Sequence, residues 1–157
     1  MRPVRIASSL VSEMAAHARA TYPDECCGFL IASPDPLDPG SPRTIVAVEA
    51  AANEFEGERR RRFLVRPDEL RAAEGRLEGT DRSVAGFYHS HPDHPGRPSQ
   101  FDQEHAWPWY TYVVLGLDRN EVRESRAFEL DSEAREFHEV PMTVEPGSGS
   151  LPKVLEG

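Results

Sequence analysis

Cysteine is nearly absent from this sequence, and the two that occur, Cys26 and Cys27, are adjacent. Neighbouring residues in an extended chain point to opposite sides, so a bond between these two sulfur atoms is geometrically disfavoured. With no third cysteine in the sequence, a disulfide framework is excluded. Reduced thiols are typical of the cytoplasm, which is therefore the location that we expect.

Long apolar runs are also missing. No segment approaches the roughly 20 apolar residues that a helix needs to cross a bilayer. The first stretch, residues 1–14, is interrupted too early by serine and glutamate to resemble a secretory signal. Both absences agree with a cytoplasmic location and no membrane partner.

Basic residues are outnumbered by acidic ones, 18 against 27, which gives a formal net charge of -9. A phosphate backbone would be repelled overall, so we expect no nucleic-acid partner. The exception is a run of four arginines: Arg59, Arg60, Arg61 and Arg62. Such a run is usually a solvated loop. A docking patch for an acidic partner is the alternative, and the sequence leaves both open.

The 157 residues suit one domain, and the apolar pattern predicts a mixed α/β (α+β) fold. Leu10, Met14 and Ala18 follow helical spacing after Ser8 or Ser9, either of which could cap the helix. We expect helices over residues 8–20, 67–78 and 99–106. Strands are expected over residues 28–32, 44–50, 83–91 and 110–117, with a β-hairpin formed by 122–130 and 134–144.

Proline and glycine mark the ends of these elements. Residues 33–43 contain four prolines and one glycine and are expected to form a loop. Residues 145–157 lack a core-forming pattern and are expected to be a disordered tail. With no internal repeat, the sequence predicts a single domain over residues 1–144, built on one mixed central sheet with two or three packed helices.

Two histidines stand at the end of the expected strand 83–91. His89 and His91 are two residues apart, so their side chains lie on one face of the strand. Asp102 follows in the first turn of the next helix, after a proline-rich loop that can return its carboxylate to the imidazoles. Two histidines and one carboxylate form a known zinc ligand set that leaves a fourth position for water, as in catalytic sites.

Each part of this pattern also has a simpler interpretation. A pair of histidines in a loop is common at protein surfaces. Ser99 and Asp102 have the spacing of a helix N-cap, in which the serine accepts a backbone hydrogen bond and the aspartate faces the helix dipole. The joint spacing of all four residues favours the metal site over either simpler interpretation.

That spacing, HSHP, six residues, then SQFD, resembles the motif of the JAMM (MPN-plus, JAB/MPN/Mov) metallopeptidase family. The resemblance implies an MPN/JAB-like domain with cytidine-deaminase-like layering. It implies one zinc ion bound by His89, His91 and Asp102, with water as the fourth ligand. It also implies that Ser99 stabilises the tetrahedral intermediate, and that Glu25, in PDECCGFLIA, acts as general base. Asp24 is the rival for that role.

The other histidines and the tryptophans have less specific surroundings in the sequence. His94 is interpreted as a surface or entrance residue, and His105 as a candidate to support the ligand Asp102 from the same helix face. His17 and His138 are interpreted as ordinary. Trp107 and Trp109 are expected to anchor the core or its rim.

The family resemblance also implies a substrate class. Members cleave amide or isopeptide bonds at the C-terminus of ubiquitin-like proteins, and compact bacterial members are associated with sulfur-carrier proteins that end in Gly-Gly. The tail of such a substrate could add as a strand to the sheet, with an acidic carrier against the four arginines. Two alternatives remain open: a non-catalytic scaffold of the same fold, and a thiol hydrolase that uses Cys26 or Cys27.

Overall fold

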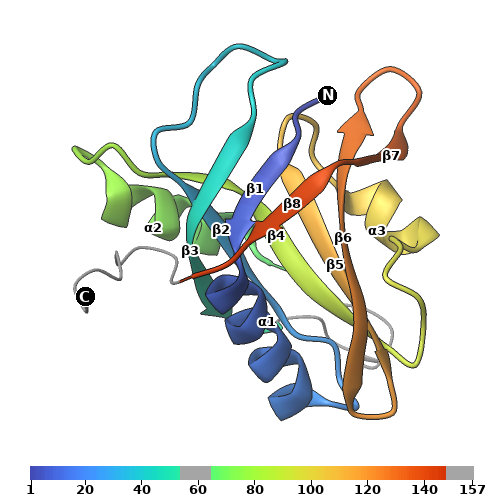
Figure 1. Ribbon diagram of the computed structural model, residues 1–157. Coiled ribbons are helices and arrows are strands. Elements are labelled where there is room, and N and C mark those ends of the chain that lie inside the picture. Colours follow the sequence, from blue (N-terminus) through green and yellow to red (C-terminus); the bar gives the residue numbers. More distant parts are fainter. Residues whose placement is uncertain (54–64, 148–157) are drawn as a thin grey trace.

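The structure is a computed structural model that describes residues 1–53 and 65–147. Its strands are β1 (Val4–Ala7), β2 (Cys27–Ala32), β3 (Arg43–Ala51), β4 (Ser83–Pro92), β5 (Thr111–Asp118), β6 (Glu121–Asp131), β7 (Glu136–Val140) and β8 (Met142–Glu145). Within the described residues these eight strands form one mixed sheet in the order β7-β6-β5-β4-β2-β3-β1-β8 (Figure 1). The consecutive strands β7 and β8 therefore occupy opposite edges of the sheet.

One face of the sheet is covered by α1 (Ser8–Thr21), which crosses it diagonally (Figure 1). Leu10, Met14 and Ala18 are the buried residues of this helix, as their spacing predicted. The N-cap is Ala7 rather than Ser8 or Ser9, because β1 runs directly into the helix without an intervening turn.

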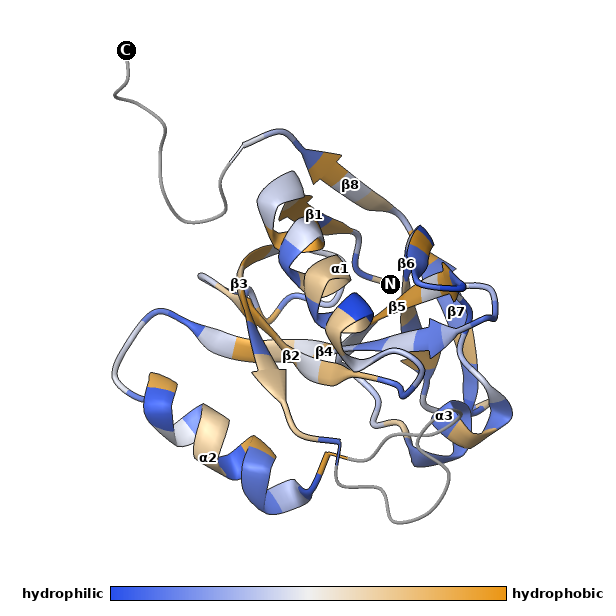
Figure 2. Ribbon diagram, turned by 90° about the horizontal axis from the view of Figure 1, so that it is seen from below, coloured by the Kyte–Doolittle hydropathy of each residue, from blue (hydrophilic) through white to orange (hydrophobic). Residues whose placement is uncertain are grey.

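The other face packs against α2 (Pro67–Leu77) and α3 (Gln100–His105). Pro67 lies in the first turn of α2, where its missing N–H costs no hydrogen bond. The apolar side of α2 faces the sheet and its charged side faces outward (Figure 2). Cys26 belongs to the core beneath α1 and Cys27 to the core on the opposite face, so the two thiols point apart as expected.

Two short strands differ from the expectation. Residues 4–7 were not expected to be a strand, yet β1 pairs in parallel with both β3 and β8. Residues 142–144 were expected in the hairpin with 122–130. The hairpin instead ends at Val140, where Pro141 cannot donate to a strand ladder and its carbonyl oxygen accepts from Val4 N at 2.9 Å.

The other helices and strands begin within two residues of the positions expected for them, whereas the disordered tail expected from residue 145 does not begin there. The fold class, a mixed sheet with helices on both faces, is confirmed. Glu145, the first residue of the expected tail, ends β8 and pairs with Arg5. Residues 148–157 and the four arginines Arg59–Arg62 lie outside the described residues. Among the residues described, no helix is long and apolar enough to span a membrane.

Candidate metal centre

The pairing of β2 with β4 brings Glu25 to the two histidines. In this antiparallel pair Cys27 lies opposite His89. The pairing continues one step further, where Ser90 N donates to Cys26 O at 3.1 Å and Cys26 N donates to Ser90 Oγ at 2.8 Å. The next position in this register sets Glu25 opposite His91, and Glu25 Oε2 lies 3.9 Å from His91 Nε2.

Asp102 reaches the same place through the first turn of α3. Ser99 is the N-cap: its hydroxyl oxygen accepts from Asp102 N at 3.1 Å, and its backbone N donates to Asp102 Oδ2 at 2.8 Å. This capping box folds the aspartate side chain back toward the sheet. Asp102 Oδ2 then lies 3.1 Å from His89 Nε2. The helix cap and the candidate metal site thus share Asp102 and do not exclude each other.

The structure gathers Glu25, His89 and Asp102, all buried, with one ligand atom of each within 4.8 Å of the others. His91 lies at the edge of this cluster, its ring centroid 5.8 Å from that of His89. The Pro95 carbonyl lies 3.2 Å from His91 Nδ1 and can only accept a hydrogen bond, so Nδ1 carries the proton. In the neutral imidazole, His91 Nε2 then carries no proton. Its lone pair is on the side of Glu25, as a metal ligand requires.

The two carboxyl groups of the cluster have opposite electrostatic surroundings. Burial and the neighbouring Asp102 charge raise the pKa of Glu25 to about 9. Burial alone would raise the pKa of Asp102 as well, but the His89 imidazole and the Ser99 N–H lower it to about 2. Burial and the neighbouring His89 lower the pKa of His91. The protein itself therefore holds one proton on Glu25 and leaves both a carboxylate and a neutral imidazole beside it.

This donor set fits a bound cation. Glu25 is 1% exposed, and neither of its carboxyl oxygens has a hydrogen-bond partner among the described residues. Asp102 Oδ1 is also buried without a partner in that part of the chain. Unpaired buried carboxyl oxygens are costly unless a cation is near them. Imidazole nitrogens and carboxylate oxygens together are typical zinc ligands.

An apolar pocket of about 450 Å³ opens directly beside the cluster. Its walls include Phe87, Trp107 and Tyr112, and His89 and Asp102 lie on the side facing the cluster. Trp107 packs on Phe87 with ring centroids 5.6 Å apart, and Tyr112 stacks on Phe87 at 5.4 Å. Trp107 was expected to anchor the core or its rim, and it lies in the wall of this pocket. The contributions of Phe87 and Tyr112 depend on the pairing of β4 with β5, in which these two residues lie opposite each other.

The remaining histidines lie outside the three-residue cluster. His94 contacts His91 ring to ring at 5.5 Å and bridges to Leu117. His105 Nδ1 bonds the carbonyl oxygen of Phe101 and its ring stacks on Phe101, so its contacts do not support Asp102 as had been suggested. Two others have partners of their own: His17 bonds Tyr88 and His138 approaches Asp131.

Both cysteines are buried, next to Glu25 in the sequence but in the cores of the sheet. Burial raises the pKa of the Cys26 thiol to about 11. A nucleophilic cysteine needs an exposed thiolate with a lowered pKa. These surroundings argue against the thiol-hydrolase alternative.

Comparison with known proteins agrees with this geometry. Residues 7–131, which include every member of the cluster, match the family described as prokaryotic homologs of the JAB domain. The chain belongs to this prokaryotic JAB family. The match confirms the resemblance to the JAB/MPN family.

A desampylase of Haloferax volcanii is 32% identical to this protein over 111 residues, which are 70% of this chain and 75% of the desampylase. A Salinibacter ruber protein is 30% identical, with TM-score 0.66 over 96% of this chain and 93% of that chain. A Desulfitobacterium hafniense protein has TM-score 0.76 at 23% identity, with 92% and 94% covered. A JAB1/MPN domain protein of Archaeoglobus fulgidus has TM-score 0.54 at 15% identity, with 91% and 99% covered, and supports the fold.

Proposed function

We propose that this JAB-family protein is a zinc-dependent peptidase or isopeptidase. It would hydrolyse an amide bond at the C-terminus of a ubiquitin-like or sulfur-carrier protein. The observation that carries the proposal is the buried cluster of Glu25, His89 and Asp102 with its unpaired carboxyl oxygens. The desampylase relative supports a ubiquitin-like protein conjugate as the substrate class.

His89, His91 and Asp102 would hold the zinc ion. When bound, zinc lowers the pKa of a water to about 7 and polarises the substrate carbonyl. Glu25 remains within 3.9 Å of His91 and beside the ligands, where it can contact that water. Because burial keeps Glu25 protonated near neutral pH, it needs a neighbouring cation to ionise and act as a base.

Glu25 then moves one proton in two steps. Its carboxylate accepts the proton of the water as the water oxygen bonds to the substrate carbonyl carbon. It delivers that proton to the nitrogen of the leaving amine as the C–N bond breaks, and a free carboxyl terminus remains. Burial at 1% exposure keeps bulk water from competing for the proton.

Ser99 can stabilise the oxyanion while it caps α3. Its hydroxyl oxygen accepts from Asp102 N, and this leaves the hydroxyl hydrogen available to donate. A hydrogen bond to the substrate oxygen is worth most when negative charge develops there. Both proposed roles of Ser99 are therefore compatible with one side-chain position.

The aromatic pocket next to the cluster would receive an apolar side chain of the substrate adjacent to the scissile bond. Its walls are mostly apolar, and Phe87 and Trp107 give it flat surfaces. An apolar side chain buried there would contribute to binding in proportion to its area. The pocket could thus hold an apolar part of the proposed substrate close to the cleavage site, such as the aliphatic stem of the linked lysine.

Zinc analysis and cleavage test this function together. The substrate is a Gly-Gly-terminated ubiquitin-fold carrier linked through its C-terminus either to cysteine or to a lysine side chain. We expect about one zinc per chain and cleavage after the second glycine. His89→Ala should lose zinc and activity, whereas His94→Ala, which changes a nearby histidine in the loop after β4, should retain both. A protein that binds no zinc, or cleaves equally well without His89, contradicts the proposal.

The non-catalytic scaffold is the second candidate. A scaffold has no need for a buried carboxyl group without partners, since an apolar or amide side chain would be less costly at that position. The presence of a buried Glu25 beside His89 and Asp102 therefore favours catalysis.

A further inference from the structure

Asp102 and Ser99 are presented by an unusually short helix. The helix α3 contains six residues, Gln100–His105. Helices this short are unstable on their own in water, because nucleation is unfavourable and few bonds follow it. The capping box holds the first turn. The position of Asp102 therefore also depends on what holds the last turn.

The last turn of α3 is held by Arg135. Its Nη2 donates to Gln103 O at 3.2 Å and to Glu104 O at 3.1 Å, and its Nη1 donates to Ala106 O at 3.3 Å. Carbonyl groups at a helix C-terminus have no partner within the helix, and a positive side chain there also faces the negative end of the helix dipole. One guanidinium thus satisfies three carbonyls at the end of the helix.

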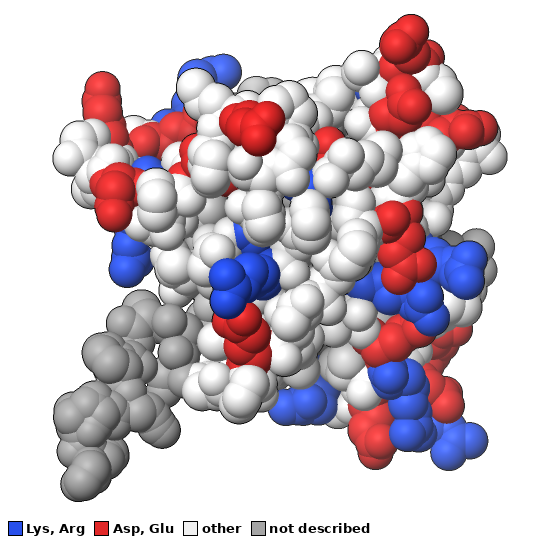
Figure 3. All heavy atoms as spheres, turned by 45° about the horizontal axis from the view of Figure 1, so that its top comes forward, with Lys and Arg blue, Asp and Glu red and all other residues white. Residues whose placement is uncertain are grey.

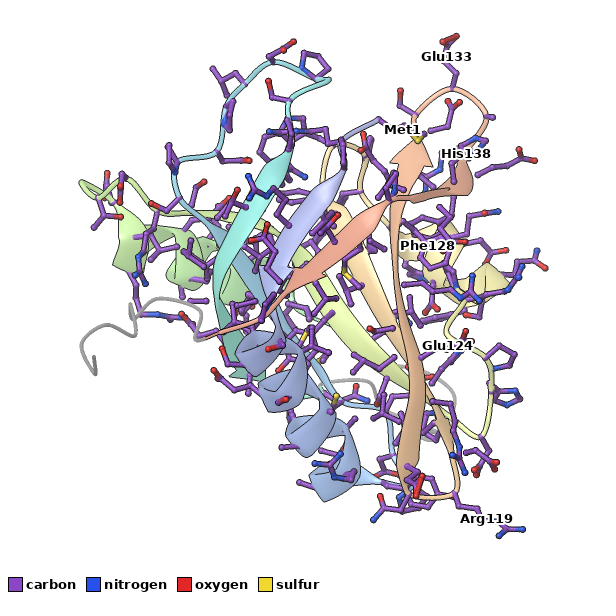
Figure 4. The ribbon with its side chains drawn as sticks, viewed as in Figure 1. Met1, Arg119, Glu124, Phe128, Glu133 and His138 are labelled. Atoms are coloured by element: carbon purple, nitrogen blue, oxygen red, sulfur yellow. The ribbon has the colours of Figure 1, made fainter. Side chains whose placement is uncertain are left out.

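The β6–β7 turn holds Arg135 in this position. Arg135 has φ of 56°, and its N donates to Asp131 O at 2.8 Å. Asp131 Oδ1 in turn accepts from the backbone N of Glu133 and Ala134. The left-handed conformation is unfavourable for a non-glycine residue, so the turn hydrogen bonds are needed to maintain it. Glu133 projects from this turn at the top of Figure 4, and acidic side chains gather at the same corner in Figure 3.

A backbone contact from β7 strengthens the attachment. Phe137 N donates to the side-chain oxygen Oε1 of Gln103 at 2.9 Å. In Figures 1 and 2, α3 lies against the hairpin formed by β6 and β7. The family match ends at residue 131, so Arg135 and Phe137 fall outside the part of the chain that defines the family.

We infer that Arg135 is a positioning residue for the metal centre, which it reaches through α3. By fixing the last turn of α3, it keeps Asp102 within reach of His89, 3.1 Å away. This inference rests on the proposed function for its catalytic consequence. The hydrogen bonds from Arg135 to the end of α3, here called the clamp, do not depend on that function. The inference and the proposed function can therefore fail separately.

Arg135→Met tests the inference, because methionine keeps much of the apolar stem and removes all the donors. Arg135→Lys retains a charged donor group. Arg123→Met is the matched control: Arg123 lies on β6 and pairs with Glu121, away from α3. Each full-length variant is measured for zinc affinity by chelator competition, for kcat and KM, and for amide exchange of α3 in the metal-free protein.

For Arg135→Met we expect zinc affinity lower by about 10- to 100-fold, lower kcat and nearly unchanged KM. Amide exchange in α3 should accelerate by about tenfold or more while the rest of the sheet keeps its protection. Arg135→Lys should recover part of each effect, and Arg123→Met should match the wild type.

Three results would overturn the inference. The first is an Arg135→Met protein whose amide exchange in α3 and whose zinc affinity equal those of the wild type. The second is a raised KM with unchanged kcat, because Arg135 also lines the aromatic pocket and would then act only on substrate. The third is loss of protection throughout the sheet in both Arg135 variants, which would make the residue a general stability element. A wild type that binds no zinc instead contradicts the proposed function, while the exchange experiment still tests the clamp.

Discussion

Glu25→Gln is expected to stabilise the metal-free protein by an amount that grows with pH. Glu25 is 1% exposed, has no hydrogen-bond partner among the described residues, and has its pKa raised from 4.5 to about 9. The folded protein therefore retains a proton that the unfolded chain releases. The stability from this retained proton is full below the unfolded pKa and is lost as pH rises toward the folded pKa.

The size of the effect follows from the same shift. Between the two pKa values, each pH unit lowers the free energy of unfolding of the wild type by about 1.4 kcal/mol relative to glutamine, which does not titrate. From about pH 5 to about pH 7 the wild type should lose about 3 kcal/mol that the variant keeps. For a chain of this length that corresponds to a Tm difference of roughly 5–10 °C.

Urea or thermal unfolding of both proteins in chelator, at several pH values, measures this difference. Glu121→Gln is the control, since the Glu121 side chain is 68% exposed and should show little pH dependence. Saturating zinc should reduce the slope, because a neighbouring cation favours the ionised carboxylate. Parallel curves for the wild type and Glu25→Gln in chelator would refute the reasoning, since Glu25 would then ionise equally in both states.

Three further predictions concern the substrate and the thiols. Trp107→Ala should raise KM several-fold with little change in kcat, because it removes an apolar wall of the pocket; steady-state kinetics with unchanged KM would exclude substrate contact there. Reversing the charges of Arg59, Arg60, Arg61 and Arg62 should raise KM for an acidic carrier. If the variant has the same KM as the wild type at every salt concentration, the docking hypothesis is wrong. Alkylation of folded protein, or the double substitution Cys26→Ser and Cys27→Ser, should leave turnover near wild type, because both thiols are buried; loss of turnover in proportion to alkylation would revive the thiol mechanism.

Local sequence was sufficient for the longer elements. The α1 spacing and Pro67 predicted two helices to within about one residue of their observed ends. The strand preceding the proline-rich loop was likewise located correctly. These patterns succeed because apolar spacing and proline act within a few residues.

Non-local pairing explains what was missed. β1 and β8 have four residues each, too few for a clear pattern. They form because they pair with each other and because β1 also pairs with β3. The position of Glu25 beside His91 depends on the register of β2 with β4, which no local pattern contains. Glu25 was identified from the family resemblance and not from a local pattern. Arg135 had no sequence signal, because its role depends on the hairpin returning to α3.

The most direct test of the account is the mass of the carrier released from a Gly-Gly-linked conjugate by zinc-loaded protein. The wild type should release a carrier that ends at the second glycine. Glu25→Gln should bind zinc as the wild type does yet cleave at least about 100-fold more slowly, since a positioned general base contributes that much or more. Normal cleavage by a zinc-loaded Glu25→Gln protein would contradict the assignment of Glu25 as the base and, with it, the proposed mechanism.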